Sequence, residues 1–348
     1  MIIVRAPMRI SFAGGGTDLS AFYERSPGRV ISAAIDKYVY VTVNRPPLIQ
    51  KVSARYSSSE LVDHPKDLKN DRIREALLHL GITSHIDVGS FSDVPVKTGL
   101  GSSSSFSVAL MKALLVAQGK KADRGEVAEL ASHLEIDLVK EPIGKQDQYA
   151  AAFGGLNVFQ FNPDHSVEAT PVRLDYKKQF AFESHLQVFY TGVTRLASSV
   201  LTEQRANTDK RFDTLKKMAD SVPLFKDRLL AGDFEGLGAL LNEGWSMKKT
   251  LASNVSAPVI DDMHAAATKA GAWGGKVLGA GGGGCIMFLA PVERKSAIRN
   301  AVLAVGQKSH LEEFAEIPVR LVRGGVEVLL NHNQGGRYSE AVRKPLFS

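Results

Sequence analysis

The chain has 348 residues, of which 44% are hydrophobic and 23% charged, a globular composition that excludes a disordered, collagen-like or disulfide-stapled protein. Its single cysteine cannot form an internal disulfide, and Arg5 and Arg9 interrupt the apolar N-terminal stretch. We therefore expect a cytoplasmic protein with no signal peptide and no membrane partner. The net charge of +6 comes without a Lys/Arg block, which argues against nucleic-acid binding and suits small anionic ligands.

The spacing of apolar residues predicts strands and helices along the whole chain. In chain order these are strands at 2–13 and 30–44, a helix at 71–80, a strand at 84–91, helices at 102–118 and 124–140, strands at 156–161 and 186–191, several helices between 197 and 271, a strand–glycine–strand unit at 275–290, a helix at 292–304 and closing strands at 317–330. Asp123 and Glu126 predict a capping box at the start of the 124–140 helix.

Strands lead in the first half and helices fill the middle of the second, which favours an α+β protein. At ~150 residues per domain the length predicts two domains. We place the boundary near 175–190 and divide the chain into 1–180 and 181–348, with the final strands free to return to the N-terminal domain.

The first candidate site is a glycine-rich turn, KTGLG at 97–101, followed by four serines, Ser102 to Ser105. Such a turn leaves backbone N–H groups free at the positive end of a helix dipole, where they bind phosphate. Serine hydroxyls there can bind phosphate or a magnesium ion. The alternative is a serine-capped helix after a tight turn. It is not a Walker A loop, because the Gly-Lys-Ser/Thr ending is absent.

A second candidate is the segment 144–155, with the sequence GKQDQYAAAFGG. Asp147 lies among polar residues that look too irregular for a plain helix, and its carboxylate could accept a proton from a substrate hydroxyl. Glu135, on the preceding helix, flanks that helix's buried face at about 80° from its centre. The alternative for Asp147 is a solvated or helix-capping carboxylate.

Two further glycine clusters stand at 14–16 and 279–284. Arg9 and Asp18 bracket the first, which is either part of a site or an exposed turn with two surface charges. The second fits the dinucleotide pattern GxGxxG, but a strand follows it where a Rossmann fingerprint needs a helix. It therefore predicts a glycine hairpin that abuts a ligand or another loop. No two histidines stand at metal-ligand spacing, so we expect no structural zinc site.

Taken in order, these segments resemble the motifs of the GHMP kinase superfamily. APMRISFAGGGTD is similar to its first motif, GLGSSSS to its phosphate-binding second motif and KVLGAGGGGC to its third, while GKQDQYAAAFGG resembles the region that carries the catalytic aspartate of its sugar kinases. The resemblance covers nearly the whole chain. It implies the GHMP kinase fold, an N-terminal domain like domain 2 of ribosomal protein S5 and a C-terminal ferredoxin-like domain. It also implies that ATP, with Mg²⁺, phosphorylates a small alcohol.

The resemblance implies a role for each matching residue. Asp147 would be the catalytic base or polariser of the attacking hydroxyl, and Arg9 would neutralise charge on the phosphoryl group. Ser103 and Glu135 would hold Mg²⁺. The residues expected to bind ATP are Lys97, Gly99, Leu100, Gly101, Ser102, Ser103, Ser104, Gly281 and Gly282. The residues expected to bind the substrate are Gly15, Gly16, Thr17, Asp18, Lys145, Gln146 and Arg195.

The acceptor is implied more finely by two stretches. Gly15 and Gly16 replace the Glu-His pair of galactokinases, which opens volume for a larger sugar, and the stretch 245–248 adds a resemblance to kinases of D-glycero-D-manno-heptose 7-phosphate. Their 1,7-bisphosphate product serves GDP-heptose for capsule or lipopolysaccharide. A cation away from the ATP would bind the 7-phosphate, with Arg195, Lys145 and Arg25 as candidates. The alternatives are a kinase for a fucose- or galactose-type sugar and an inactive sensor of sugar and nucleotide. A homodimer is compatible with all three.

Overall fold

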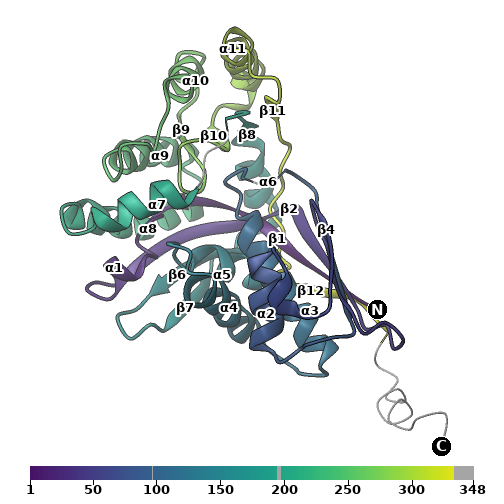
Figure 1. Ribbon diagram of the computed structural model, residues 1–348. Coiled ribbons are helices and arrows are strands. Elements are labelled where there is room, and N and C mark those ends of the chain that lie inside the picture. The colour runs from purple at the N-terminus through teal and green to yellow at the C-terminus, as the bar shows by residue number, and fades with distance from the viewer. Residues whose placement is uncertain (96, 194–196, 333–348) are drawn as a thin grey trace, which may run out of the picture.

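The computed structural model describes residues 1–95, 97–193 and 197–332 (Figure 1). These residues form two β-sheets with helices packed on them, so the predicted α+β class is confirmed. Within these ranges no helix has both the length and the apolar character needed to cross a bilayer.

The larger sheet is organised around two long antiparallel strands, β1 (Ile2–Ala13) and β2 (Gly28–Asn44). The second half of β2 pairs with β5 (Ile86–Ser92) and its first half with β6 (Leu156–Phe161). In the described residues this sheet has eight strands, the others being β3 (Val52–Arg55), β4 (Ser59–Val62), β7 (Val167–Pro171) and β12 (Glu327–Asn331).

The inner half of β1 is buried on both faces. Met8, Ile10 and Phe12 point into an apolar core. Because successive side chains of a strand point to opposite faces, Arg9 and Ser11 point the other way. Both are 3% exposed, so this strand carries a buried charge on the face opposite its apolar side chains.

Helix α3 (Ser102–Ala117) packs across β1 and β2. Around it lie α2 (Asp71–His79), α4 (Arg124–His133) and α5 (Gln146–Phe153), as Figure 1 shows. The predicted capping box of α4 is present, because Asp123 and Glu126 each accept a hydrogen bond from the other's backbone N–H. The helix ends earlier than predicted, and the chain continues as a π-helical turn, Leu134–Leu138.

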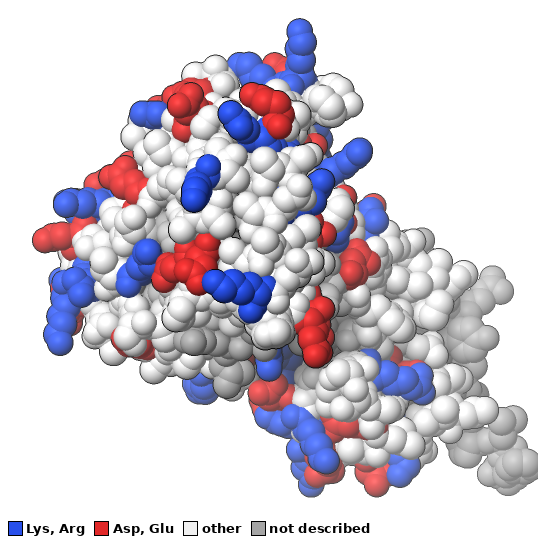
Figure 2. Space-filling model, turned by 90° about the horizontal axis from the view of Figure 1, so that it is seen from above, with Lys and Arg blue, Asp and Glu red and all other residues white. Residues whose placement is uncertain are grey.

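The smaller sheet has the strand order β11-β8-β10-β9. Its strands are β8 (Leu186–Tyr190), β9 (Gly274–Val277), β10 (Cys285–Leu289) and β11 (Ala315–Glu316). The remaining helices are α1 (Ser20–Tyr23), α6 (Tyr176–His185), α7 (Ala197–Ala206), α8 (Phe212–Ala231), α9 (Phe234–Lys249), α10 (Pro258–Lys269) and α11 (Lys295–Lys308). On the face that Figure 2 shows, side chains of both charges are interspersed, so the net charge of +6 forms no continuous basic surface there.

The two sheets share one apolar core. Phe12 of β1 stacks on Phe225 of α8, with ring centroids 5.5 Å apart, and meets Phe182 of α6 edge-on at 5.4 Å. Strand β12 returns to pair with the start of β1. The division at 180/181 remains a prediction, and side chains from both of its sides pack into this core.

The closing strands predicted for 317–330 are wrong in large part, because β11 ends before this range, at Glu316, and within it only β12 forms, from Glu327 onward. Ile317 N still donates to Val188 O (2.8 Å), but Pro318 has no N–H with which to continue the ladder. The chain then crosses to the larger sheet, where Asp36 N donates to Arg320 O (2.9 Å). The segment thus ties the two sheets together.

Candidate active site

A cleft of about 710 Å³ lies where β1, α3, α5 and α9 meet. It brings together residues from distant parts of the sequence. The predicted site residues on its wall are Arg9, Gly15, Gly16, Asp18, Lys97, Gly99, Gly101, Ser102, Ser103, Ser104, Gln146 and Asp147.

Arg9 and Asp147 form a bidentate ion pair on this wall. Arg9 Nε donates to Asp147 Oδ1 (2.7 Å) and Arg9 Nη2 donates to Asp147 Oδ2 (2.6 Å). Arg9 Nη1 also donates to Gly99 O (2.6 Å), which ties the pair to the glycine turn. The side chain of Arg9 is 3% exposed and that of Asp147 is 23% exposed. The carboxylate is therefore the more accessible member of the pair.

The segment around Asp147 is a regular helix, so the prediction of an irregular segment is wrong. Asp147 lies in the first turn of α5, where the helix dipole favours a carboxylate. Three consecutive alanines, 150–152, are buried against the core. Gly154 ends the helix with a φ of +67°, and a Cβ there would lie 2.1 Å from the backbone of Gly324. The alanines that hold this helix close to the sheet weaken its sequence signal, because they form no amphipathic stripe.

The glycine turn before α3 faces the ion pair. Gly99 and Gly101 have φ values of +75° and +79°, which glycine adopts without strain. A Cβ on Gly101 would lie 3.4 Å from Asp147 Oδ2 and 3.3 Å from Arg9 Cγ. The N–H groups of the first helical turn have no helical acceptor. Beside the Arg9–Asp147 pair, these N–H groups are therefore free to bind an anion.

Members of the serine run differ in what they contact. Ser102, Ser103 and Ser104 line the cleft. Ser105 Oγ instead donates to Pro7 O (2.8 Å) inside the core. Leu100 is buried, and its carbonyl accepts a bond from Arg9 N (2.9 Å).

The glycine segment 279–284 packs against the turn at 97–101. A Cβ on Gly279 would lie 2.8 Å from Gly99 Cα, so the two backbones touch. Gly279 lines the cleft, whereas Gly281 and Gly282 do not. Gly282 N donates to Val255 O (2.6 Å). Strand β10 follows, as the sequence predicted when it excluded a Rossmann fingerprint.

Glu135 is fully buried directly behind Ser103, where the π-helical turn places it. Ser103 Oγ donates to Glu135 Oε1 (3.1 Å), Arg72 Nε to the same oxygen (3.0 Å) and Gln148 Nε2 to Oε2 (2.6 Å). Arg72 also pairs with Glu141. Burial alone would lower the pKa of Arg72, but the two glutamates outweigh it and raise that pKa.

Ser103 and Glu135 are the predicted magnesium ligands, and their oxygens lie 3.1 Å apart. Mg²⁺ prefers oxygen donors, with one or two carboxylates completed by phosphate and water. Ser103 lines the cleft, but Glu135 does not, and Arg72 and Gln148 already donate to its oxygens. An ion bound to Glu135 would therefore have to displace one of these donors, with a nucleotide completing its coordination. Within the described residues no three His, Cys, Asp or Glu side chains form a metal-binding group.

Asp18 and Gln146 form a second polar group on the cleft wall, close to Asp147. Gly16 N (2.9 Å) and Gln146 Nε2 (3.0 Å) both donate to Asp18 Oδ1. Burial, together with the negative charge of Asp147, raises the pKa of the Asp18 carboxyl. A Cβ on Gly15 would make ordinary contact with Gln146 Nε2 (3.8 Å), whereas one on Gly16 would lie 2.2 Å from Gln204 Nε2. The volume expected at these two glycines is therefore already filled by Gln204 beside Gly16.

The other predicted substrate residues do not line the cleft. Thr17 Oγ1 donates to Gly14 O (2.8 Å), within its own turn. Lys145 Nζ pairs with Glu129 Oε2 (2.9 Å), away from the cleft wall. Arg25 pairs with an exposed aspartate. Arg195 lies outside the described residues.

The wall also carries polar residues to which the sequence analysis gave no role, among them Gln204 of α7 and Lys248 of α9, although Lys248 ends the 245–248 stretch of the resemblance. Gln204 is 2% exposed, and its Nε2 has no hydrogen-bond partner among the described residues. Lys248 is 5% exposed, and its Nζ donates to Gly279 O. One signal could have found Lys248, because it shares the buried face of α9 with Leu241 and Trp245 at helical spacing.

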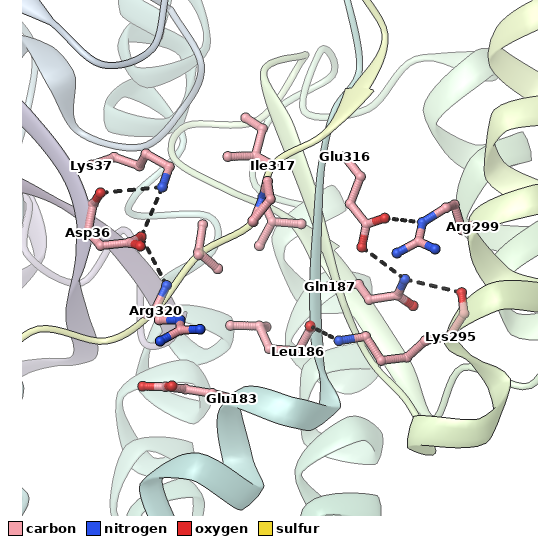
Figure 3. A pocket seen from close by; sticks show the side chains of 13 residues that line it. Asp36, Lys37, Glu183, Leu186, Gln187, Lys295, Arg299, Glu316, Ile317 and Arg320 are labelled. Carbon is pink, nitrogen blue, oxygen red and sulfur yellow. Dashed lines mark hydrogen bonds and ion pairs between the residues drawn. The ribbon is translucent and has the colours of Figure 1, made fainter.

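A second cavity, of about 340 Å³, lies where the chain crosses between the two sheets (Figure 3). Lys37 pairs with Asp36, and Arg299 pairs with Glu316. Lys295 Nζ donates to two backbone carbonyls. Because these cations already have partners in the cavity wall, we assign the chemistry to the cleft.

Comparison with known proteins agrees with this geometry. Residues 70–155 match the family of GHMP kinases N terminal domains, and residues 225–308 match the GHMP kinases C terminal family. The chain is 26% identical to the D-glycero-alpha-D-manno-heptose 7-phosphate kinase of Campylobacter jejuni, over 90% of this chain and 96% of that protein. It is also 26% identical to the galactokinase of Pyrococcus furiosus, over 90% and 95%. The crystal structure of a D-glycero-D-manno-heptose 1-phosphate kinase from Bacteroides thetaiotaomicron superimposes with a TM-score of 0.77 at 24% identity, over 95% of this chain and all of that one.

Proposed function

The chain belongs to the GHMP kinase family, and we propose that it is a sugar 1-kinase that phosphorylates the anomeric hydroxyl of D-glycero-D-manno-heptose 7-phosphate. The product would be the 1,7-bisphosphate, a precursor of GDP-heptose for surface polysaccharide. One observation carries the kinase chemistry. Gly101, the N-cap residue of α3, lies beside the Arg9–Asp147 pair, so that a Cβ on it would be 3.3 Å from Arg9 Cγ and 3.4 Å from Asp147 Oδ2. The phosphate-binding turn and the proton acceptor thus share one cleft.

In the proposed reaction, Asp147 accepts the proton of the attacking hydroxyl as its oxygen bonds to the γ-phosphorus of ATP. The bond from that phosphorus to the β–γ bridging oxygen breaks, and the electron pair leaves with ADP. Arg9 holds the carboxylate in place through two hydrogen bonds and carries positive charge beside the phosphoryl group. Phosphoryl transfer asks a protein mainly for such positioning and charge neutralisation.

The nucleotide would lie along the glycine turn. The N–H groups at the start of α3 would bind the β- and γ-phosphates, and Mg²⁺ at Ser103 and Glu135 would neutralise charge on those phosphates. The wall of the same cleft also carries aromatic and apolar side chains, Val39, Tyr56, Phe91 and Phe106. Phe91 is 67% exposed, and a nucleotide base would cover it.

The acceptor would lie against Asp18, Gln146 and Gln204. Gln146 Oε1 and Gln204 Nε2 are buried without hydrogen-bond partners in the described residues. A buried amide group left unpaired costs about 1–3 kcal/mol, and a sugar hydroxyl would pair each of them. The relatives that are sugar kinases support a sugar as acceptor. The heptose assignment rests on the relative from Campylobacter jejuni.

An acceptor panel tests this proposal. The purified protein, with ATP and Mg²⁺, is given heptose 7-phosphate, galactose, L-fucose, mevalonate or no acceptor, and ADP release is measured. We expect kcat/KM for heptose 7-phosphate to exceed every other by ~100-fold or more, with ³¹P NMR showing the new phosphate on the anomeric carbon. A higher value for galactose or fucose would replace the heptose assignment. If the protein binds nucleotide but turns over none of these acceptors, the alternative of an inactive sensor would replace the kinase proposal.

A further inference from the structure

Lys248 is a buried cation for which the mechanism above has no use. It lies in the last turn of α9, is 5% exposed and lines the cleft. Among the described residues its ammonium group makes one hydrogen bond, to the uncharged carbonyl of Gly279. An ammonium group has three N–H donors, so its capacity to donate is only partly used.

The charged groups that act on Lys248 come from four segments of the chain. Arg9 on β1 and Lys276 on β9 add positive charge, while Asp18 in the first glycine turn and Asp147 on α5 add negative charge. Burial, with the charge of Arg9 adding to it, lowers the pKa of Lys248 to about 8. A lysine in this environment gains from an anion that can bind its free donors.

Lys276 shows what a buried structural lysine looks like in the same region. Its Nζ donates to Ser11 O (2.9 Å) and Phe12 O (3.2 Å), and it does not line the cleft. Lys248 differs in both respects, since it has one partner and faces the cleft. Its position therefore points to a ligand rather than to support of the backbone.

The contacts of Lys248 locate that ligand. Gly279, which accepts its hydrogen bond, lies against Gly99 of the phosphate-binding turn. Gly99 O in turn accepts the bond from Arg9 Nη1. Lys248 binds the backbone of Gly279, Arg9 binds that of Gly99, and these two backbones touch. Both cations therefore lie at the end of the turn that is next to Asp147.

We propose that Lys248 is a catalytic residue that donates hydrogen bonds to the phosphoryl group while that group passes from the nucleotide to the acceptor. The proposal rests on the kinase activity proposed above, although not on the identity of the sugar. Lys248 stays protonated through the step. It supplies positive charge as the bond to the acceptor oxygen forms and the bond to ADP breaks, which is when charge on the phosphoryl oxygens needs stabilising.

The test uses MgADP with aluminium fluoride, a mimic of the phosphoryl group in transit that needs no acceptor. We expect Lys248→Met to bind MgADP within ~3-fold of the unchanged protein but to lose ~100-fold or more in affinity for MgADP with aluminium fluoride. With a working acceptor, kcat should fall ~10²–10³-fold and KM for ATP should change little. Equal losses for both nucleotide complexes, or no loss for either, would overturn the proposal.

A measurement on the unchanged protein covers the case in which Lys248→Met does not fold. At pH 9 a lysine with a pKa of about 8 is mostly neutral, so an anion that binds it draws in a proton. Calorimetry in two buffers of different ionisation heat should show proton uptake on binding MgADP with aluminium fluoride and much less on binding MgADP alone. Equal proton uptake for the two complexes contradicts the role. Failure of MgADP to bind at all would contradict the kinase itself.

Discussion

The two cavities of this molecule differ in what their lysines have left to bind, although each also has a buried amide atom without a partner among the described residues, Gln187 Oε1 between the sheets and Gln204 Nε2 in the cleft. In the cavity between the sheets, Lys37, Lys295 and Arg299 each bind a neighbouring carboxylate or carbonyl. In the cleft, Lys248 binds one uncharged carbonyl, and Gln204 Nε2 has no partner among the described residues.

Arg9 and Arg72 in the cleft are ion-paired like the cations of the other cavity, so the contrast depends on Lys248. Both cavities are lined by several cations, so charge alone does not distinguish them. Groups paired with one another already have their electrostatic stabilisation, and a ligand would have to break those pairs to bind. Groups with unused donors and acceptors gain from a ligand directly. Four changes test whether the contrast holds.

The largest effect is expected from Asp147→Asn. The variant keeps the shape of the side chain but cannot accept a proton, so kcat should fall ~10²–10⁴-fold while nucleotide affinity stays within a few-fold. Glu129→Gln is the matched control, because it removes a carboxylate from the Lys145 ion pair outside the cleft. ADP release and nucleotide titration measure both variants. Near-normal turnover in Asp147→Asn would remove this residue from the mechanism.

The next effect is expected from Gly101→Val. A side chain there meets Arg9 and Asp147 and forces strain at a φ of +79°, so the dissociation constant for ATP should rise ~10-fold or more. Gly119→Val is the control at the far end of α3. It has a φ of +72° but nothing within 4 Å of its Cβ. If both variants lose nucleotide affinity equally, backbone strain rather than the phosphate turn is responsible.

A smaller effect, on stability, is expected from the pH dependence of Lys248→Met. The pKa of Lys248 falls from 10.5 in the unfolded chain to about 8 in the folded protein, so the unfolded chain binds more protons between these values. Folding of the unchanged protein therefore gains about 3 kcal/mol from this group as pH rises through that window. Any stability advantage of the methionine variant should be largest below pH 8 and shrink towards pH 10.5. Urea unfolding at several pH values measures the difference, and a gap that grows with pH would contradict the assignment.

The smallest effect is expected from Arg299→Ala in the cavity between the sheets. Its partner Glu316 is partly exposed, and such surface pairs contribute ~0–1 kcal/mol. Turnover and nucleotide affinity should stay within ~2-fold, and the melting temperature should change little. A large loss of activity would mean that this cavity has a function after all.

Sequence reasoning located the elements that carry strong local signals. The strands β1 and β2, the helix α3 after its glycine turn and the capping box of α4 all follow from periodicity and from turn or cap chemistry. The residues of the glycine turns, with Arg9, Asp18 and Asp147, were also identified from sequence, because their motifs occur in the order seen in the GHMP kinase superfamily. These features depend on residues close together in the chain.

The features that sequence reasoning missed depend on long-range packing. Helix α5 is short and alanine-rich, so it has no amphipathic stripe, and the sheet beneath it decides its conformation. The segment after Pro318 leaves one sheet for the other, which a local strand pattern does not record. Gln204 lies on a helix outside every motif, and the 245–248 stretch gave Lys248 no role. Only the fold turns these two side chains into the cleft.

The pairing of β12 with β1 has a consequence for how the chain is made. Strand β1 has one edge that is covered by residues 327–331, which are made long after it. Until they pair with it, this edge of β1 is open and other strands can join it. Truncation before residue 327 should therefore favour aggregation more than a comparable deletion at a surface loop.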